Sequence, residues 1–148
     1  MVHMRRRRFL WTIAAGASAL QAGEPWTDAD VRQPGSLAKD LQAGKKPLIL
    51  YVGFPVLYKA ARIPGAVLAG PGSKQSGLDA MQQALSGVPK DHEIVLYCGC
   101  CPFDHCPNIR PAFEKIRAMG YSNVSLVMMP TNFHSDWVEK GYPVDKAS

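Results

Sequence analysis

The sequence of 148 residues predicts an α/β fold with a mostly parallel central sheet and helices on both of its faces. The prediction depends on an alternation along the chain between short apolar runs and longer segments with apolar residues at helical spacing. The runs at Leu48–Val52 and Ile94–Tyr97 are apolar at every position, as is typical of parallel strands covered on both sides. A third observation concerns chemistry, because every cysteine of the chain follows the second of these runs.

Residues 1–22 are expected to be a signal peptide rather than part of the fold. Arg5–Arg8 form a basic region and Phe9–Leu20 an apolar region, and small residues surround Ala19 and Ala22, so that cleavage is expected after one of these two alanines. The run Arg6–Leu10 also resembles the twin-arginine export signal. The 12 apolar residues are fewer than the roughly 20 that span a bilayer. We therefore expect a periplasmic mature protein with no stable membrane span.

The remaining residues, 23–148, are expected to form one domain, since this length suffices for a hydrophobic core. The chain has 17 basic and 12 acidic residues, and four of the basic ones are the arginines of the export signal. The predicted mature chain thus carries a net charge of only +1. Such a balance offers no basic patch for an anionic polymer, so we expect no nucleic-acid partner.

The first half of the mature chain begins with a predicted helix. Thr27 can cap a helix that runs to about Leu41, with a break at Pro34. The further predicted elements are a strand at Leu48–Val52, a surface loop that includes Tyr58 and Lys59, a turn and short strand at Ile63–Leu68, and a helix at Leu78–Leu85.

The central stretch of the sequence places a thiol where a strand ends. Cys98 follows the predicted strand Ile94–Tyr97, and a loop with Cys100, Cys101 and Cys106 leads to a helix capped by Asn108 or a neighbour. Unpaired amides and the helix dipole stabilise an anion at such a helix start. We therefore predict that Cys98 has a lowered pKa and acts as a nucleophile.

The last part of the chain predicts a strand at Val124–Val127 and a final helix at about Asn132–Lys140. In parallel sheets, functional sites form at the carboxyl ends of the strands. Cys98 and the segment Met128–Asn132 are expected to be neighbours there. Trp137 is predicted to belong to the core.

Several short motifs resemble those of the rhodanese-like sulfurtransferases, in order and spacing, over nearly the whole mature chain. They are the strand Leu48–Val52, the turn Arg62–Ala66 (similar to the family's HIPGA), the strand and cysteine Ile94–Cys98, the segment Met119–Val124 (similar to LGYxNV) and the segment Trp137–Val144 (similar to WxxxGxPV).

This resemblance implies a rhodanese-like three-layer fold and a sulfurtransferase in which Cys98 carries sulfur as a persulfide. The implied partners are a small, thiosulfate-like sulfur donor and a thiol acceptor, which includes a protein thiol, and no cofactor is implied. The chain departs from the family pattern at Gly53, in place of the arginine of an Asp-x-Arg signature, and at Arg62, in place of a histidine. The loop after Cys98 is also longer than the family's.

The spacing of the four cysteines favours a chemical role over structural disulfides. Any bridge among them closes a loop of at most nine residues, and such a short loop adds little to the stability of the fold. One interpretation is sulfur transfer, with Cys101 or Cys106 resolving or relaying the sulfur on Cys98. Another is dithiol redox chemistry through the C-x-x-C of Cys98 and Cys101. Two alternatives remain, a soft-metal (zinc or copper) module with Cys98, Cys101, Cys106 and His105 as ligands, and a noncatalytic partner-binding domain.

The candidate site residues divide into two groups, and no metal ligand is assigned. The catalytic candidates are Cys98, Cys101 and Cys106. The substrate-binding candidates are Arg62, Gly99, Cys100 and Arg110. As the second thiol for Cys98 we favour Cys101 slightly over Cys106, since C-x-x-C is a known redox spacing. Cys100 is not favoured, because a bridge across one residue forces a strained ring.

Overall fold

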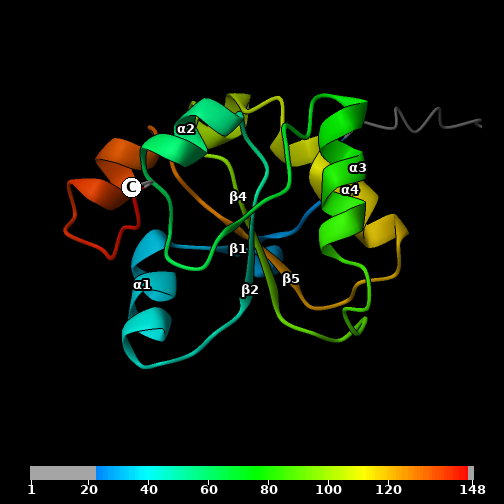
Figure 1. The fold of residues 1–148 in the computed structure, drawn as a ribbon, viewed down its shortest axis with the longest axis horizontal. Helices are drawn as coiled ribbons and strands as arrows, with labels where there is room; N and C mark the ends of the chain where they lie inside the picture. The colour runs from blue at the N-terminus through cyan, green and yellow to red at the C-terminus, as the bar shows by residue number, and fades with distance from the viewer. Residues whose placement is uncertain (1–22, 147–148) are drawn as a thin grey trace, which may run out of the picture.

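The computed structural model describes residues 23–146, so the expected signal peptide lies outside the described residues. The centre of the fold is a five-stranded parallel sheet with the strand order β1-β5-β4-β2-β3. The strands are β1 Val31–Arg32, β2 Leu48–Tyr51, β3 Val67–Leu68, β4 Ile94–Tyr97 and β5 Val124–Val127. The predicted α/β fold with a parallel sheet is therefore confirmed (Figure 1).

Helices cover both faces of the sheet. The helical segments are η1 Asp28–Asp30, α1 Pro34–Gln42, α2 Pro55–Ala60, α3 Gln75–Ala84, η2 Phe103–His105, α4 Ile109–Ala118 and the π-helical η3 His134–Val138. In Figure 1, α3 and α4 lie together on one side of the sheet, and α1 lies on the other. Among the described residues, no helix has both the length and the apolar character that a membrane span requires.

The central strand β4 joins the two halves of the core. Its side chains alternate between them, so that Leu96 packs with residues of α4 and Tyr97 packs with Leu37 of α1 and with Trp137. All four residues of β4 are buried. This explains the unbroken apolar run in the sequence, because a parallel strand covered on both faces has no solvent side.

The prediction of a helix at Thr27–Leu41 is wrong for the first half of this range. A single 3-10 turn, η1, comes first, and the extended residues of β1 then pair with β5. Helix α1 begins at Pro34, where we predicted a break. The fixed φ of proline and its missing N–H suit the first position of a helix, so Pro34 starts a helix rather than interrupting one.

Two further elements differ from the prediction. Tyr58 and Lys59 belong to the short helix α2, which begins at Pro55 for the same reason as α1. The last helix is a π-helical turn, η3, shorter than the range Asn132–Lys140. Trp137 lies in η3, is fully buried as predicted, and donates its indole N–H to the Pro143 carbonyl at 2.7 Å.

The contact between α3 and the loop before it yields a prediction. Ala is normally about 0.5–1 kcal/mol more stable than Gly inside a helix. At Gly77, however, an added Cβ would lie 1.9 Å from the carbonyl oxygen of Pro71. We expect Gly77→Ala to lower the free energy of unfolding by about 1–3 kcal/mol in urea denaturation, because the backbone must move apart. Ser76→Ala, at an exposed position of the same helix, should change it by less than about 0.5 kcal/mol. A Gly77→Ala protein as stable as wild type would contradict this packing.

Candidate active site

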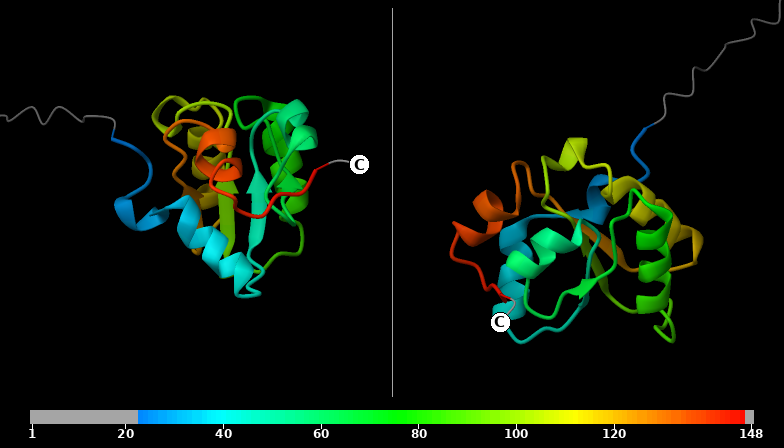
Figure 2. Two further views of the ribbon diagram at one scale, coloured as in Figure 1. Left: turned by 90° about the vertical axis from the view of Figure 1, so that its left-hand side faces the viewer. Right: turned by 45° about the horizontal axis from the view of Figure 1, so that its top comes forward.

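The cysteine loop leaves the sheet at the carboxyl end of β4, where Cys98 is the first residue. In the left view of Figure 2, this loop, α2 and η3 gather at the same edge of the sheet. Gly99 follows with φ +72°, a conformation that favours glycine. An added Cβ there would lie 2.6 Å from the Cβ of Phe133, whose N–H donates to the Gly99 carbonyl at 2.9 Å. Gly99 therefore fixes the path of the loop against the segment before η3.

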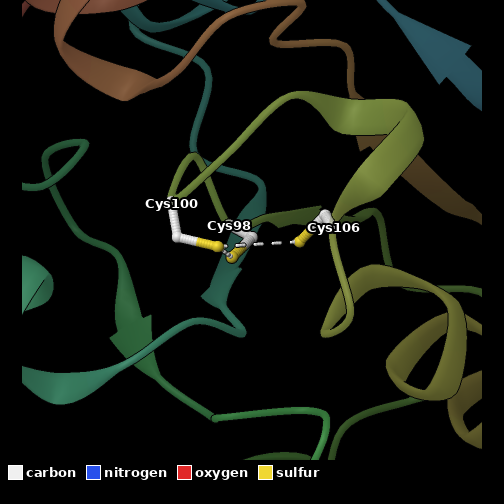
Figure 3. Close-up of side chains that lie close together, drawn as sticks. All are labelled: Cys98, Cys100 and Cys106. Atoms are coloured by element: carbon white, nitrogen blue, oxygen red, sulfur yellow. Dashed lines mark hydrogen bonds between the residues drawn. The ribbon is translucent and has the colours of Figure 1, made fainter.

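The loop folds back on itself so that three thiols meet. The sulfur atoms of Cys98, Cys100 and Cys106 all lie within 4.8 Å of one another, an arrangement we call the thiol cluster (Figure 3). The Sγ atoms of Cys98 and Cys100 are 3.2 Å apart, and those of Cys100 and Cys106 are 4.0 Å apart. Cys98 is buried, whereas the other two are half-buried.

Cys101 lies outside the thiol cluster. Its Sγ is 3.0 Å from that of Cys100 and donates to the His105 carbonyl at 3.9 Å. The C-x-x-C spacing in the sequence therefore does not bring Cys101 into the group around Cys98, and Cys106 takes that place. The catalytic role assigned to Cys101 stays a prediction.

The packing of Phe103 explains why the loop folds back toward Cys98. Its side chain is buried, and its N–H donates to the Met129 carbonyl at 3.1 Å. The rings of Phe103 and Trp26 are 5.3 Å apart, so the chain just before η1 packs on the loop. These apolar contacts draw the middle of the loop inward, and the next three residues carry the chain to Cys106.

Asn108 is the functional residue that the sequence analysis missed. Its side chain is fully buried, and its amide Nδ2 donates to Cys98 Sγ at 3.4 Å and to Cys100 Sγ at 3.8 Å. Its Oδ1 accepts the N–H of Ser73 at 3.0 Å. We expected Asn108 or a neighbour to cap α4, but the Asn108 side chain makes no capping bond. The sequence does contain a signal for this role, since Asn108 is a polar residue between the cysteine-rich loop and a helix with an apolar face.

The thiol cluster places its negative charge away from Cys98. Hydrogen bonding to Cys100 and Cys106, together with burial, raises the pKa of Cys98 far above its ordinary value. The hydrogen bond from Cys98, assisted by those from Cys101 and Asn108, lowers the pKa of Cys100 to about 5. The expectation that Cys98 itself has a lowered pKa is therefore wrong. The helix start acts on the loop thiols, while Cys98 is too deeply buried to hold the charge alone.

The other two loop cysteines also differ from each other. Burial and the hydrogen bond with Cys100 raise the pKa of Cys101 to about 12. The pKa of Cys106 is lowered by hydrogen bonding with Cys98 and by the backbone N–H groups of Asn108 and Ile109. The anion therefore lies on the Cys100 and Cys106 side of the cluster, next to the start of α4.

A cavity of about 340 Å³ opens above the thiol cluster. Cys98 and Cys100 contribute to its wall, and Cys101 and Cys106 do not. The wall is otherwise mainly apolar, with Tyr51, Leu57, Ala60, Ala61, Gly99, Asn132, Phe133, His134 and Val138.

Gly53 makes room for the buried thiol. A Cβ at this position would lie 2.9 Å from Cys98 Sγ and 2.5 Å from the hydroxyl oxygen of Tyr51. The Tyr51 hydroxyl donates to the Phe54 carbonyl at 2.9 Å, so it is held in place beside the thiol. The position at which the family motif has an arginine therefore presents no charged group to the cavity.

The two arginines predicted to bind substrate have other partners. The Arg110 guanidinium pairs with the Glu24 carboxylate and lies 5.7 Å from the ring centre of Trp26. The Arg62 guanidinium lies 4.6 Å from the ring centre of Tyr58 and donates to the carbonyl of that residue at 3.3 Å. Neither arginine lines the cavity, and their substrate-binding role stays a prediction.

The fold and the site together define an α/β protein with a cysteine at the carboxyl end of a central parallel strand. No family model matches the chain, and no curated protein matches its sequence. Solved structures do resemble it. A crystal structure of the Alr3790 protein from Anabaena sp. is 20% identical with a TM-score of 0.61, over 78% of this chain and 92% of that one.

Two further structures agree with this. The solution NMR structure of the rhodanese-like domain of Alr3790 is 19% identical with a TM-score of 0.60, over 79% of each chain. The crystal structure of the BH2092 protein from Bacillus halodurans is 20% identical with a TM-score of 0.59, over 78% of this chain and 75% of that one. The chain therefore has a rhodanese-like fold, as its sequence motifs implied.

The charge distribution in the loop predicts an order of thiol reactivity. At pH 6 a thiol with a pKa of about 5 is mostly thiolate, whereas one with a pKa of about 12 is protonated. Limiting iodoacetamide should therefore label Cys100 well before Cys101 in the reduced, folded protein, as measured by peptide mass spectrometry. In denaturant all four thiols should react at similar rates, since their surroundings become alike. Labelling of Cys101 ahead of Cys100 in the folded state would overturn the assignment of the charge.

Proposed function

We propose that this protein transfers sulfane sulfur through a persulfide on Cys98. The observation that carries the proposal is that Cys98 and Cys100, which share a short S···S hydrogen bond, both lie in the wall of the cavity. The rhodanese-like fold supports it, because it brings Cys98 to the edge of the sheet where such sites form. The expected export signal makes the periplasm the proposed location.

The nucleophile in this proposal is a thiol pair. Above a pH of about 5 the Cys98 and Cys100 pair holds one proton and one negative charge. The proton moves from Cys98 to Cys100 across their 3.2 Å hydrogen bond as the Cys98 sulfur attacks. With a donor R–S–SH, the attack on the outer sulfur forms Cys98–S–SH and releases the thiolate RS⁻. One S–S bond breaks and one forms, so no oxidant or reductant is consumed.

The lining of the cavity favours an organic persulfide over thiosulfate as the donor. Among the described residues, those that line the cavity include no lysine and no arginine. His134 is exposed at the rim, and its imidazole lies 3.3 Å from the Glu139 carboxylate. A dianion such as thiosulfate would lose its hydration there without gaining a cationic partner, which is costly. A small thiol with an apolar body and a terminal persulfide would instead bury apolar surface against Leu57 and Phe133.

In this proposal Cys106 resolves the persulfide when no acceptor thiol arrives. Its thiolate can attack the inner sulfur of Cys98–S–SH, which forms a Cys98–Cys106 disulfide and releases HS⁻. An external dithiol would then be needed to reduce the bridge. The sulfur atoms begin within 4.8 Å of each other, so the loop must close by under 3 Å to reach a disulfide length of about 2.0 Å.

The proposal predicts different effects for the loop cysteines. With a small alkyl persulfide as donor and a thiol acceptor, Cys98→Ser should lower kcat/KM by at least about 10³-fold, because the nucleophile is lost. Cys101→Ser, the matched control in the same loop, should stay within about threefold of wild type. Thiosulfate should be a poorer donor than the alkyl persulfide. A Cys98→Ser protein with full activity would refute the role of Cys98.

The pH profile tests the proton transfer to Cys100. The wild-type rate should be nearly constant above pH 6, because the pair is already ionised there. In Cys100→Ser, buried Cys98 must lose its own proton, so the rate should be low at pH 6 and rise by up to about tenfold per pH unit. A Cys100→Ser profile as flat as that of wild type would show that Cys100 is not involved.

The resolving step predicts one particular disulfide. Persulfide-loaded protein kept without an acceptor should release sulfide and yield a Cys98–Cys106 peptide under nonreducing digestion. The Cys106→Ser variant should retain the persulfide longer, whereas Cys101→Ser should behave like wild type. A Cys98–Cys101 bridge as the main product would instead support the C-x-x-C pairing favoured by the sequence.

A further inference from the structure

We propose that the thiol cluster of Cys98, Cys100 and Cys106 binds one copper(I) ion in a trigonal site with three thiolate ligands. This function goes beyond sulfur transfer and uses a ligand set that the sequence did not indicate. The soft-metal alternative predicted from the sequence combined Cys98 and Cys106 with Cys101 and His105. Neither Cys101 nor His105 belongs to the group of sulfur atoms that the fold brings together.

The spacing of the sulfur atoms fits a single small cation. A metal about 2.3 Å from three sulfur atoms in one plane holds them about 4.0 Å apart. The Cys100 and Cys106 sulfur atoms are already at 4.0 Å, and no pair in the cluster exceeds 4.8 Å. The Cys98 and Cys100 pair, at 3.2 Å, must open by about 0.8 Å. Because Cys100 lies in a loop and is half-buried, this movement does not disturb the sheet.

The number and type of ligands favour copper(I) over zinc. Among the described residues, no fourth histidine, cysteine, aspartate or glutamate has a ligand atom within 4.8 Å of all three sulfur atoms. Cys101, whose Sγ is 3.0 Å from that of Cys100, does not meet this condition. A structural zinc site takes four protein ligands, whereas thiolate sulfur is the ligand type that selects copper(I). Three thiolates without a fourth donor therefore match copper(I) more closely.

The surroundings can accommodate the charge of such a site. Copper(I) with three thiolates carries a net charge of −2, which requires N–H donors directed at the sulfur atoms. The Asn108 amide donates to Cys98 and Cys100, and the backbone N–H groups of Asn108 and Ile109 are directed at Cys106. The latter two groups belong to the start of α4, a helix of ten residues whose dipole adds to the effect.

A bound metal would also occupy the proposed nucleophile. Cys98 cannot hold copper(I) and attack a sulfur donor at the same time, so copper should inhibit sulfur transfer. The cavity beside Cys98 and Cys100 gives an ion or its carrier a route to the cluster. Copper binding itself does not depend on sulfur transfer, and the two proposals can fail separately.

The test is an anaerobic titration of the reduced, full-length protein with copper(I) in competition with the chelator bathocuproine disulfonate. The absorbance of the copper–chelator complex measures how much copper the protein retains. We expect one equivalent to be retained by the wild type. Cys98→Ser, Cys100→Ser and Cys106→Ser should each weaken retention by at least about 100-fold, while Cys101→Ser should stay within about threefold of wild type. X-ray absorption of the copper-loaded protein should give three sulfur ligands. Circular dichroism on each variant separates ligand loss from unfolding.

Several outcomes would contradict the proposed copper site. They are a failure to hold copper against the chelator, an equal loss in Cys101→Ser, a two-sulfur spectrum, or a preference for zinc in a parallel competition. Sulfur-transfer assays on the same reduced preparations, before copper is added, distinguish the two proposals. Active protein that holds no copper would refute this inference alone. Protein that is inactive before copper is added, yet then holds one copper through the three cysteines, would refute the proposed sulfur transfer alone.

Discussion

The buried amide of Asn108 is the interaction that connects the sheet, the loop and the helix at this site. Its N–H group is directed at the sulfur atoms of Cys98 and Cys100, and its oxygen accepts the N–H of Ser73. The main chain is equally confined, because a Cβ on Gly72 would lie 2.2 Å from the Asn108 carbonyl oxygen. The N–H of Gly72 in turn donates to the Val52 carbonyl at 2.8 Å, directly after β2. The thiol loop and the Gly72–Ser73 segment therefore meet at Asn108, and Gly72 connects them to the end of β2.

Burial sets the chemistry of the thiols as much as the helix start does. A thiolate at the end of β4 would be largely surrounded by apolar side chains, so the charge is more stable on Cys100 and Cys106. The proton that Cys98 retains bridges the pair, and the cluster behaves as one acid rather than as separate cysteines. The same closeness of sulfur atoms underlies both proposals, one for a shared proton and one for a shared metal ion.

The strands that matter most for the site could be predicted from the sequence. The runs that form β2 and β4 are apolar throughout, and β5 is apolar except at Ser125. This pattern has few other interpretations in a chain where such runs alternate with helices. The two-residue strand β1 was missed because Val31 also fits the apolar face of the helix predicted at Thr27–Leu41.

The internal arrangement of the loop was beyond sequence reasoning for a related reason. Spacing along the chain favoured Cys101 as the neighbour of Cys98, but the burial of Phe103 against Trp26 and Met129 decides which thiol returns. The inward amide of Asn108 depends on contacts with Ser73, 35 residues away along the chain. Such long-range contacts leave no local signature.

The packing of Trp26 on Phe103 has a consequence for the proposed export of the protein. Glu24 and Trp26 belong to the first described residues of the chain, yet they contact Arg110 and the underside of the thiol loop. Cleavage of the expected signal peptide after Trp26, instead of near Ala22, would remove the Trp26 ring and leave Phe103 uncovered. Under the proposed export, the point of cleavage would therefore decide whether the contact between Trp26 and Phe103 is kept and how firmly the thiol loop is held.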